Sequence, residues 1–160
     1  MTLIELVITL VVISLIGGII STKISSPASL TIGQQADLFA NDIRHAQLIA
    51  QTWGCQLKIV VSSSAYEVRN KAVVPNKPKC SSADTVIIDP AKRQNFSTTL
   101  RNNVQFSAGS TFDFDLKGRP LNTATDALLT TPVSLTLSGG GNTYNFSISH
   151  HTGYISMSGP

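Results

Sequence analysis

The hydrophobic pattern divides the chain into two unequal parts. Residues 6–20 hold almost nothing polar except Thr9 and Ser14, whereas the remainder mixes apolar residues with many Ser, Thr and Asn. A helix over residues 1–22 would rise roughly 33 Å, about the thickness of the hydrocarbon core of a bilayer. The first part of the chain therefore predicts a helix that is able to span a membrane.

This apolar segment has three competing interpretations: a secretory signal peptide, an ordinary transmembrane anchor, and a helix that serves both the membrane and an assembly. A signal peptide carries basic residues before its apolar run. The first basic residue of this chain is Lys23, which follows the run, and helical sequence continues beyond it. We therefore expect the segment to be retained rather than removed as a leader.

Glu5 is the polar residue that a plain anchor does not explain. A carboxylate near the start of an apolar helix costs several kcal/mol unless it is neutralised or paired. Two interpretations stay open. Glu5 either lies at the level of the lipid headgroups, where water reaches it, or meets the positive α-amino group of Met1 in a neighbouring subunit.

A second helical pattern begins at Thr31. Its apolar positions recur at spacings of four and three and form one stripe: Phe39, Ile43, Ala46, Ala50 and Trp53. This period predicts an amphipathic helix over residues 31–53 that covers a sheet. Gly54 stands where a left-handed C-terminal cap is favoured.

The connection between the two helical patterns contains Gly17, Gly18 and Pro27. Proline removes a backbone donor and clashes with the preceding turn, so this stretch should bend or unwind easily. It is either a built-in hinge or a simple linker that ends the membrane helix.

After Gly54 the hydrophobic period changes to two, which predicts strands. The expected strands cover residues 57–61, 66–68, 85–88, 104–106, 112–116, 133–137, 144–148 and 155–157. Ser62 to Ser64 and Gly139 to Asn142 supply turns, so the chain should end in an antiparallel meander. The predicted fold class is α+β, with a long N-terminal helix, half apolar and half amphipathic, packed on a small antiparallel sheet. We expect an apolar segment at 1–30 and a head at 31–160, with its β-rich part at 55–160.

The two cysteines, Cys55 and Cys80, both lie in the expected head. Such a pair, in a chain with a membrane segment, favours one structural disulfide in an oxidising compartment over two free buried thiols. Closing a loop of this length would stabilise the head by roughly 3 kcal/mol.

The net charge is +3, and much of the basic character follows the first hairpin, at Arg69, Lys71, Lys77 and Lys79. Such a stretch is usually a solvated loop. The three lysines are also the candidate contacts for nucleic acid or another acidic surface.

Candidate chemistry is sparse, and we expect neither an enzyme nor a cofactor. Adjacent His150 and His151 would need further ligands to hold a metal, so no metal site is expected. Asp113 and Asp115 lie two apart on a strand and read as a solvated acidic edge rather than a calcium site. His45 is expected to face solvent.

The string Met1-Thr2-Leu3-Ile4-Glu5-Leu6-Val7, followed by an unbroken apolar run, resembles the mature N-terminus of type IV pilins and type II secretion pseudopilins. The resemblance implies that a prepilin peptidase cuts before Met1 and methylates the new amine. It also implies storage in the bacterial inner membrane with a periplasmic head, followed by polymerisation with other pilins at an assembly platform. Pro27 matches the helix-breaking proline that the family often carries. Whether Met1 is the processed terminus stays open.

Three segments of the head resemble the GspH/FimT branch of minor pilins and pseudopilins, which includes subunits of mannose-sensitive haemagglutinin-type pili. They are residues 38–46, 114–120 and 149–155. Some members bind DNA through arginines in a C-terminal Gly-Arg motif. This chain reads Gly153-Tyr154-Ile155 there, so DNA is a doubtful partner. Lys117 and Arg119 offer a phosphate contact, but Gly118-Arg119-Pro120 more commonly forms a β-turn.

The expected function is a structural subunit of a type IV pilus or a pseudopilus, polymerised through its N-terminal helix. The alternative is a minor pilin at a filament tip that binds DNA, a surface or a secretion substrate.

Overall fold

The computed structural model describes residues 4, 5, 7, 27–72, 75, 77–80 and 82–160. Most of the predicted apolar helix, including Met1, Gly17 and Gly18, lies outside this set. Among the described residues, no helix is both long and apolar enough to cross a membrane. The elements are α2 (Pro27–Trp53), β1 (Leu57–Val61), β2 (Ala65–Asn70), η1 (Pro78–Cys80), β3 (Ser97–Thr99), β4 (Gln105–Phe106), β5 (Ser110–Phe114), β6 (Pro120–Leu121), β7 (Val133–Gly139), β8 (Asn142–Ile148) and β9 (Ile155–Ser158).

Helix α2 confirms the predicted amphipathic helix and extends it by one turn toward the N-terminus. It begins at Pro27, and proline is favoured in the first turn because its missing N–H would be unsatisfied there anyway. Every apolar position of the predicted stripe from Phe39 to Ala50 is buried. Gly54 follows the helix with a φ of 61°, as expected for a left-handed cap.

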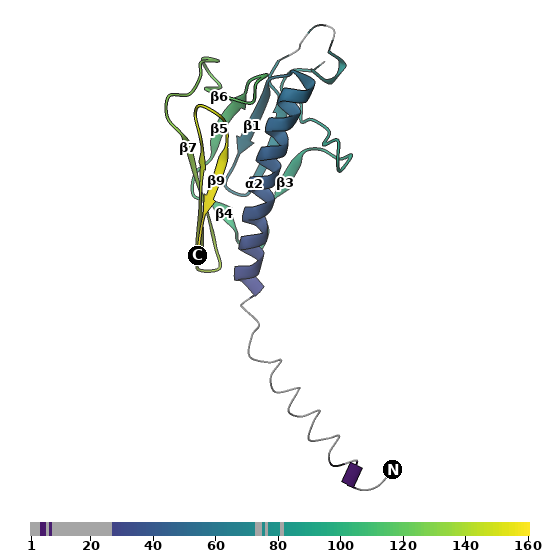
Figure 1. Ribbon diagram of the computed structural model, residues 1–160, viewed down its shortest axis with the longest axis vertical. Helices are drawn as coiled ribbons and strands as arrows, with labels where there is room; N and C mark the ends of the chain where they lie inside the picture. The colour runs from purple at the N-terminus through teal and green to yellow at the C-terminus, as the bar shows by residue number, and fades with distance from the viewer. Residues whose placement is uncertain (1–3, 6, 8–26, 73–74, 76, 81) are drawn as a thin grey trace.

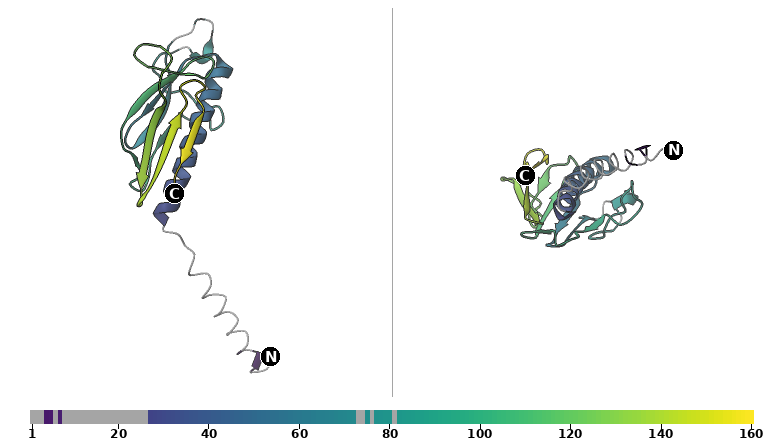
Figure 2. Two further views of the ribbon diagram at one scale, coloured as in Figure 1. Left: turned by 60° about the vertical axis from the view of Figure 1, so that its left-hand side comes forward. Right: turned by 90° about the horizontal axis from the view of Figure 1, so that it is seen from below.

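The strands form two antiparallel sheets, which corrects the expectation of a single sheet. One has the order β3-β2-β1-β5-β6 and the other the order β4-β7-β8-β9. Figure 1 and Figure 2 show α2 lying lengthwise against both of them. The sequence period could not separate one sheet from two, because alternation reports which face of a strand is buried and not which strand lies beside it.

Phe39 lies where the helix meets both sheets. Its ring packs edge-on against Tyr66 of the first sheet, at a centroid distance of 5.0 Å, and against Phe106 and Phe146 of the second sheet, each at 4.9 Å. Such aromatic contacts add to the free energy gained from burying the rings. One helix position therefore ties the three layers into a common core.

Several strand boundaries differ from the prediction. Residues 85–88 form only isolated bridges, Arg69 to Val86 and Ile88 to Asn95, while the short strands β3 and β6 were not predicted. The meander is confirmed. Its first turn has two residues, Gly140 and Gly141, with φ of 54° and 80°, and a two-residue hairpin turn of this type requires positive φ at both positions.

Candidate functional site

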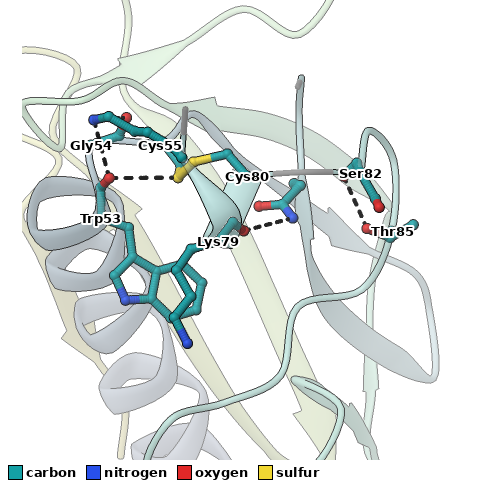
Figure 3. Close-up of a disulfide and its surroundings, with 9 residues drawn as sticks. Trp53, Gly54, Cys55, Lys79, Cys80, Ser82 and Thr85 are labelled. Carbon is teal, nitrogen blue, oxygen red and sulfur yellow. Dashed lines mark hydrogen bonds between the residues drawn. A yellow bond between two sulfur atoms is a disulfide. The ribbon is translucent and has the colours of Figure 1, made fainter. Parts of the chain in front are cut away.

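The predicted disulfide is present and lies at the C-terminal end of α2 (Figure 3). Cys55 follows Gly54 just beyond the end of α2, and Cys80 ends the short helix η1, with 6.0 Å between the two Cα atoms. Lys77 donates to the carbonyl oxygens of Trp53 and Gly54 at 3.2 and 2.9 Å. The disulfide and this ammonium group together fasten the loop to the helix end, where unpaired carbonyls favour a cation.

The three lysines proposed as nucleic-acid contacts each have a partner inside the molecule. Lys77 caps the helix, and the Lys79 ammonium lies 5.5 Å from the centre of the Trp53 ring. Lys71 donates to Asp113 at 2.6 Å and to the carbonyl oxygen of Thr123. These groups are therefore used in holding loops to the head.

Lys71 and Asp113 form a buried ion pair on the face of the five-stranded sheet opposite α2. Asp113 is fully buried, and Asp126 adds a second carboxylate 3.3 Å from the ammonium. Burial alone would lower the pKa of Lys71, but the hydrogen bonds and charges of Asp113 and Asp126 outweigh it and raise the pKa.

The expectation that Asp113 and Asp115 form a solvated acidic edge is wrong. Asp115 is also buried, at 7% exposure. It accepts hydrogen bonds from the backbone N–H groups of Lys117 and Arg119, at 2.8 and 2.7 Å, and from Arg119 Nε at 2.8 Å. The β-turn lies earlier than the predicted one at Gly118-Arg119-Pro120: Gly118 N–H donates to the Asp115 carbonyl, so the turn covers residues 115–118, and Pro120 already begins β6. Loops cover both carboxylates. The alternation of residues along the strand does not predict this cover, because it does not report what lies on the outer face of the sheet.

Gln47 joins two of the segments that carried the family resemblance. Its side-chain amide donates to the carbonyl oxygens of Gly118 and Thr152, each at 2.7 Å. Gly118 and Gly153 have positive φ, 74° and 71°, and a Cβ added at Gly153 would lie 2.3 Å from the Gly118 oxygen. The two turns approach so closely that only glycine fits at this junction.

A second buried polar cluster, which the sequence analysis missed, joins α2 to β2 and to the loop after β2. The Tyr66 hydroxyl donates to Asp42 Oδ2 at 2.8 Å, and Lys92 Nζ donates to Asp42 Oδ1 at 3.2 Å. Burial is the main cause of the raised pKa of Tyr66; the negative charge of Asp42 adds to it, and a hydrogen bond to Thr98 opposes it.

Asp89 completes this cluster. Its Oδ2 lies 3.8 Å from Lys92 Nζ, and its Oδ1 lies 3.8 Å from His45 Nδ1. His45 is only 30% exposed at its side chain, which corrects the expectation of a solvent-facing histidine. The cluster draws on residues from 42 to 92, so no local motif could have revealed it.

A groove of about 700 Å³ opens beside this cluster, between α2 and the segment that leads through β3. Its lining residues are Gln34, Gln35, Leu38, Asp89, Lys92, Gln94, Asn95, Phe96, Ser97, Thr98, Thr99, Arg101 and Asn102. Its size is in the range of ligand-binding sites.

The remaining predicted sites stay apart from these clusters. The His150 and His151 rings are in contact, with centroids 3.8 Å apart and a tilt of 42° between their planes. Within the part of the chain that the structure describes, no three His, Cys, Asp or Glu side chains are placed to hold a metal ion. Glu5 is exposed and helical, and Pro27 begins α2, whereas the other predicted assembly and hinge residues, Met1, Gly17 and Gly18, lie outside the described residues.

Comparison with known proteins identifies solved structures that share the fold of this chain. No protein-family model and no curated protein matches the sequence. Among solved structures, the minor pseudopilin EpsH of the type 2 secretion system of Vibrio cholerae is similar with a TM-score of 0.53 and 13% identity, over 81% of this chain and 98% of EpsH. The type IV minor pilin FimU of Pseudomonas aeruginosa is similar with a TM-score of 0.50 and 12% identity, over 81% of this chain and 92% of FimU. At such identities the likeness establishes the fold, and it confirms the predicted α+β class with a helix packed on antiparallel sheets.

Proposed function

We propose that this chain is a structural subunit of a type IV pilus or a type II secretion pseudopilus, of the minor kind. The observation that carries the proposal is the fold of α2 and its two sheets, which is similar to those of a minor pseudopilin and a minor pilin. The pilin-like string from Met1 to Val7 supports it from the sequence alone. Neither argument depends on the other.

In this proposal the subunit is stored in the bacterial inner membrane with its head in the periplasm, after a prepilin peptidase has exposed and methylated the amine of Met1. The assembly platform then moves its apolar helix from lipid into a filament core. In that apolar surrounding Glu5 pairs with the Met1 amine of a neighbouring subunit and fixes the register between them. Opposite charges attract strongly where water is excluded, and a buried carboxylate without a partner is costly.

The nucleic-acid version of the tip-binding alternative has less support. Lys71, Lys77 and Lys79 would have to leave internal partners before they could contact phosphates. The motif at Gly153 also lacks the arginines on which that version depends.

Substitution of Glu5 tests the proposed function. Glu5→Ala and Glu5→Gln should leave membrane insertion unchanged, because both remove a charge from an apolar helix. They should sharply reduce incorporation into filaments, because loss of one partner of a buried pair costs several kcal/mol. Sheared filaments analysed by mass spectrometry would report subunit content and methylation of Met1, and membrane fractions would report insertion.

Asp37→Ala is the matched control, since it removes an exposed carboxylate from α2 in the head. It should assemble as the wild type does. Wild-type incorporation of both Glu5 variants would refute the pairing.

A further inference from the structure

A pocket of about 410 Å³ lies at the C-terminal end of α2. Trp53, the last residue of the helix, and Pro78 and Lys79 of η1 line one part of it, and the turn after Ile87 lines another. Figure 3 shows the Trp53 ring and the Lys79 side chain close together near the disulfide. Because the disulfide joins the end of the helix to η1, this part of the pocket is covalently fixed.

Apolar side chains form the walls of this pocket. The Trp53 ring is half-buried, whereas Pro78, Ile88 and Pro90 are exposed. Ile88 is 62% exposed, so it leaves apolar area that a bound apolar group would remove from water. The two prolines have a fixed backbone torsion φ, which limits the movement of both walls. The pocket is therefore suited to an apolar group that fits between them.

Hydrogen bonds within the turn after Ile88 fix the position of Arg93. Asp89 accepts the N–H of Ala91 at its Oδ1 and the N–H of Arg93 at its carbonyl oxygen, each at 2.8 Å. The Arg93 side chain is exposed and has no carboxylate partner among the described residues. The backbone of the turn is thus held by local contacts, while the guanidinium stays available to a ligand.

The accessible charges of the pocket are both positive. Lys79 is exposed like Arg93, and its ammonium lies 5.5 Å from the centre of the Trp53 ring. The acid that lines the pocket, Asp89, is 0% exposed, and its Oδ2 lies 3.8 Å from the Lys92 ammonium. The negative charge is therefore balanced inside the protein, whereas the two bases of the pocket face water. This arrangement selects an anionic group.

The side-chain amide of Asn70 is a second, independent indication of a ligand. Asn70 lines the pocket and is 6% exposed. Its Nδ2 donates to the carbonyl oxygen of Lys79 at 3.2 Å, whereas its Oδ1 is buried without a hydrogen-bond partner among the described residues. A buried acceptor without a donor is costly. A ligand that supplies an N–H group here would remove this cost.

We propose that this pocket binds the C-terminal residue of a partner polypeptide that ends in an apolar side chain. The terminal carboxylate lies between Lys79 and Arg93. The apolar side chain packs on Trp53 and Ile88, and the last amide N–H donates to Asn70 Oδ1. Hydrogen bonds between a carboxylate and a basic side chain are short and strong, and capture of a C-terminal carboxylate is a recurrent mode of peptide recognition. The inference does not depend on the proposed filament assembly.

The test follows the fluorescence of Trp53, the single tryptophan of the chain. The full chain in nonionic detergent micelles is titrated with acetyl-Gly-Gly-Leu that has a free terminal carboxylate. One matched peptide ends in an amide, and another carries an N-methyl group on the leucine nitrogen. We expect the free acid to change the tryptophan emission and to bind at least about tenfold more tightly than either matched peptide. Isothermal calorimetry measures the same affinities without depending on the tryptophan.

A free carboxylic acid separates a polypeptide end from a small apolar acid. 4-Methylpentanoate carries the apolar body and the carboxylate of leucine without the amide N–H. It should bind at least about tenfold more weakly than the free-acid peptide, because it leaves Asn70 Oδ1 without a donor. Equal binding would contradict recognition of a polypeptide terminus.

Arg93→Gln tests the cationic side of the pocket. It keeps the backbone N–H that donates to Asp89. The variant should bind the free-acid peptide about tenfold more weakly than the wild type and the amide peptide equally well, because only the carboxylate contacts the guanidinium. Arg101→Gln is the matched control: Arg101 is also exposed but does not line this pocket, so the preference for the free acid should persist.

Three outcomes would overturn the inference. The first is no binding of the free-acid peptide at about 1 mM, by fluorescence or by calorimetry. The second is equal binding of the free-acid peptide and either matched peptide. The third is an Arg93→Gln variant that keeps the wild-type preference for the carboxylate.

Discussion

The Lys71 ammonium lies where oxygen atoms of Asp113, Thr123 and Asp126 converge. It neutralises a fully buried carboxylate, and it holds the segment after β6 against the outer face of the five-stranded sheet. The sequence gives no sign of this contact, because the three partners lie 42 to 55 residues from the lysine. A lysine in a basic stretch is normally solvated, and only the returning loop changes that.

Replacement of Lys71 should therefore destabilise the head far more than loss of a surface lysine. Lys71→Met leaves Asp113 buried without its cation, so we expect the free energy of unfolding to fall by about 3 kcal/mol. Denaturant unfolding of the full chain, followed by circular dichroism, measures the change. The double variant Lys71→Met with Asp113→Leu should recover much of the loss, because it removes the buried charge as well.

Lys58→Met is the comparison for this prediction. The partner of Lys58 is Asp84, which is 60% exposed at its side chain, and pairs of this kind contribute about 1 kcal/mol or less. Equal losses for the two lysine variants would contradict the special role of the buried pair.

Among the elements, the long helix and the final meander were predictable, and the sheet arrangement was not. The helical spacing of the apolar residues and the glycine cap at Gly54 predicted that α2 ends at Trp53. Paired glycines predicted the turn between β7 and β8. β3 and β6 have three and two residues, too few for alternation to identify. Their positions depend on long-range pairing with β2 and β5, which propensity does not encode.

The junction of α2 with the two glycine turns gives an element-scale prediction. Gly153→Ala would place a Cβ 2.3 Å from the backbone oxygen of Gly118, and it would also impose a side chain on a φ of 71°. We expect it to lower the free energy of unfolding by about 3 kcal/mol, from overpacking and backbone strain together. Thermal and denaturant unfolding of the full chain would measure the loss.

Gly141→Ala separates these two causes. Gly141 also has a positive φ, of 80°, but nothing lies within 4 Å of an added Cβ. It should show the backbone strain alone, about 1 kcal/mol. A loss at Gly153 no larger than that at Gly141 would show that the turns can separate without cost, contrary to the close junction.

For the whole molecule, the sequence predicted the fold class and the disulfide, and it missed the sites that depend on distant residues. The apolar stripe of α2 and the alternation of β1 are local patterns, so they could be read directly. The groove beside β3 and the clusters at Asp42 and Asp113 arise only when loops fold back over the sheets. Local sequence patterns thus predicted the helix and the strands, whereas the positions of the buried polar clusters depend on the tertiary structure.

Among the residues that the structure describes, the buried core of the head runs from Ile32 to Ile155. The disulfide closes within the same range. Residues 27–160 should therefore fold without the first 26 residues, as a monomer with Cys55 and Cys80 paired. We expect the free energy of unfolding to differ from that of the full chain by no more than about 0.5 kcal/mol.

Denaturant unfolding, gel filtration and thiol titration of residues 27–160 check this prediction. The slope of the unfolding transition should also match that of the full chain, because the slope reports the surface exposed on unfolding. The truncated chain should not enter filaments, since it lacks Glu5 and the apolar helix. A truncated head that unfolds, or that exposes free thiols, would mean that the apolar segment contributes to the core. The division between an assembly segment and an independently stable head would then have to be abandoned.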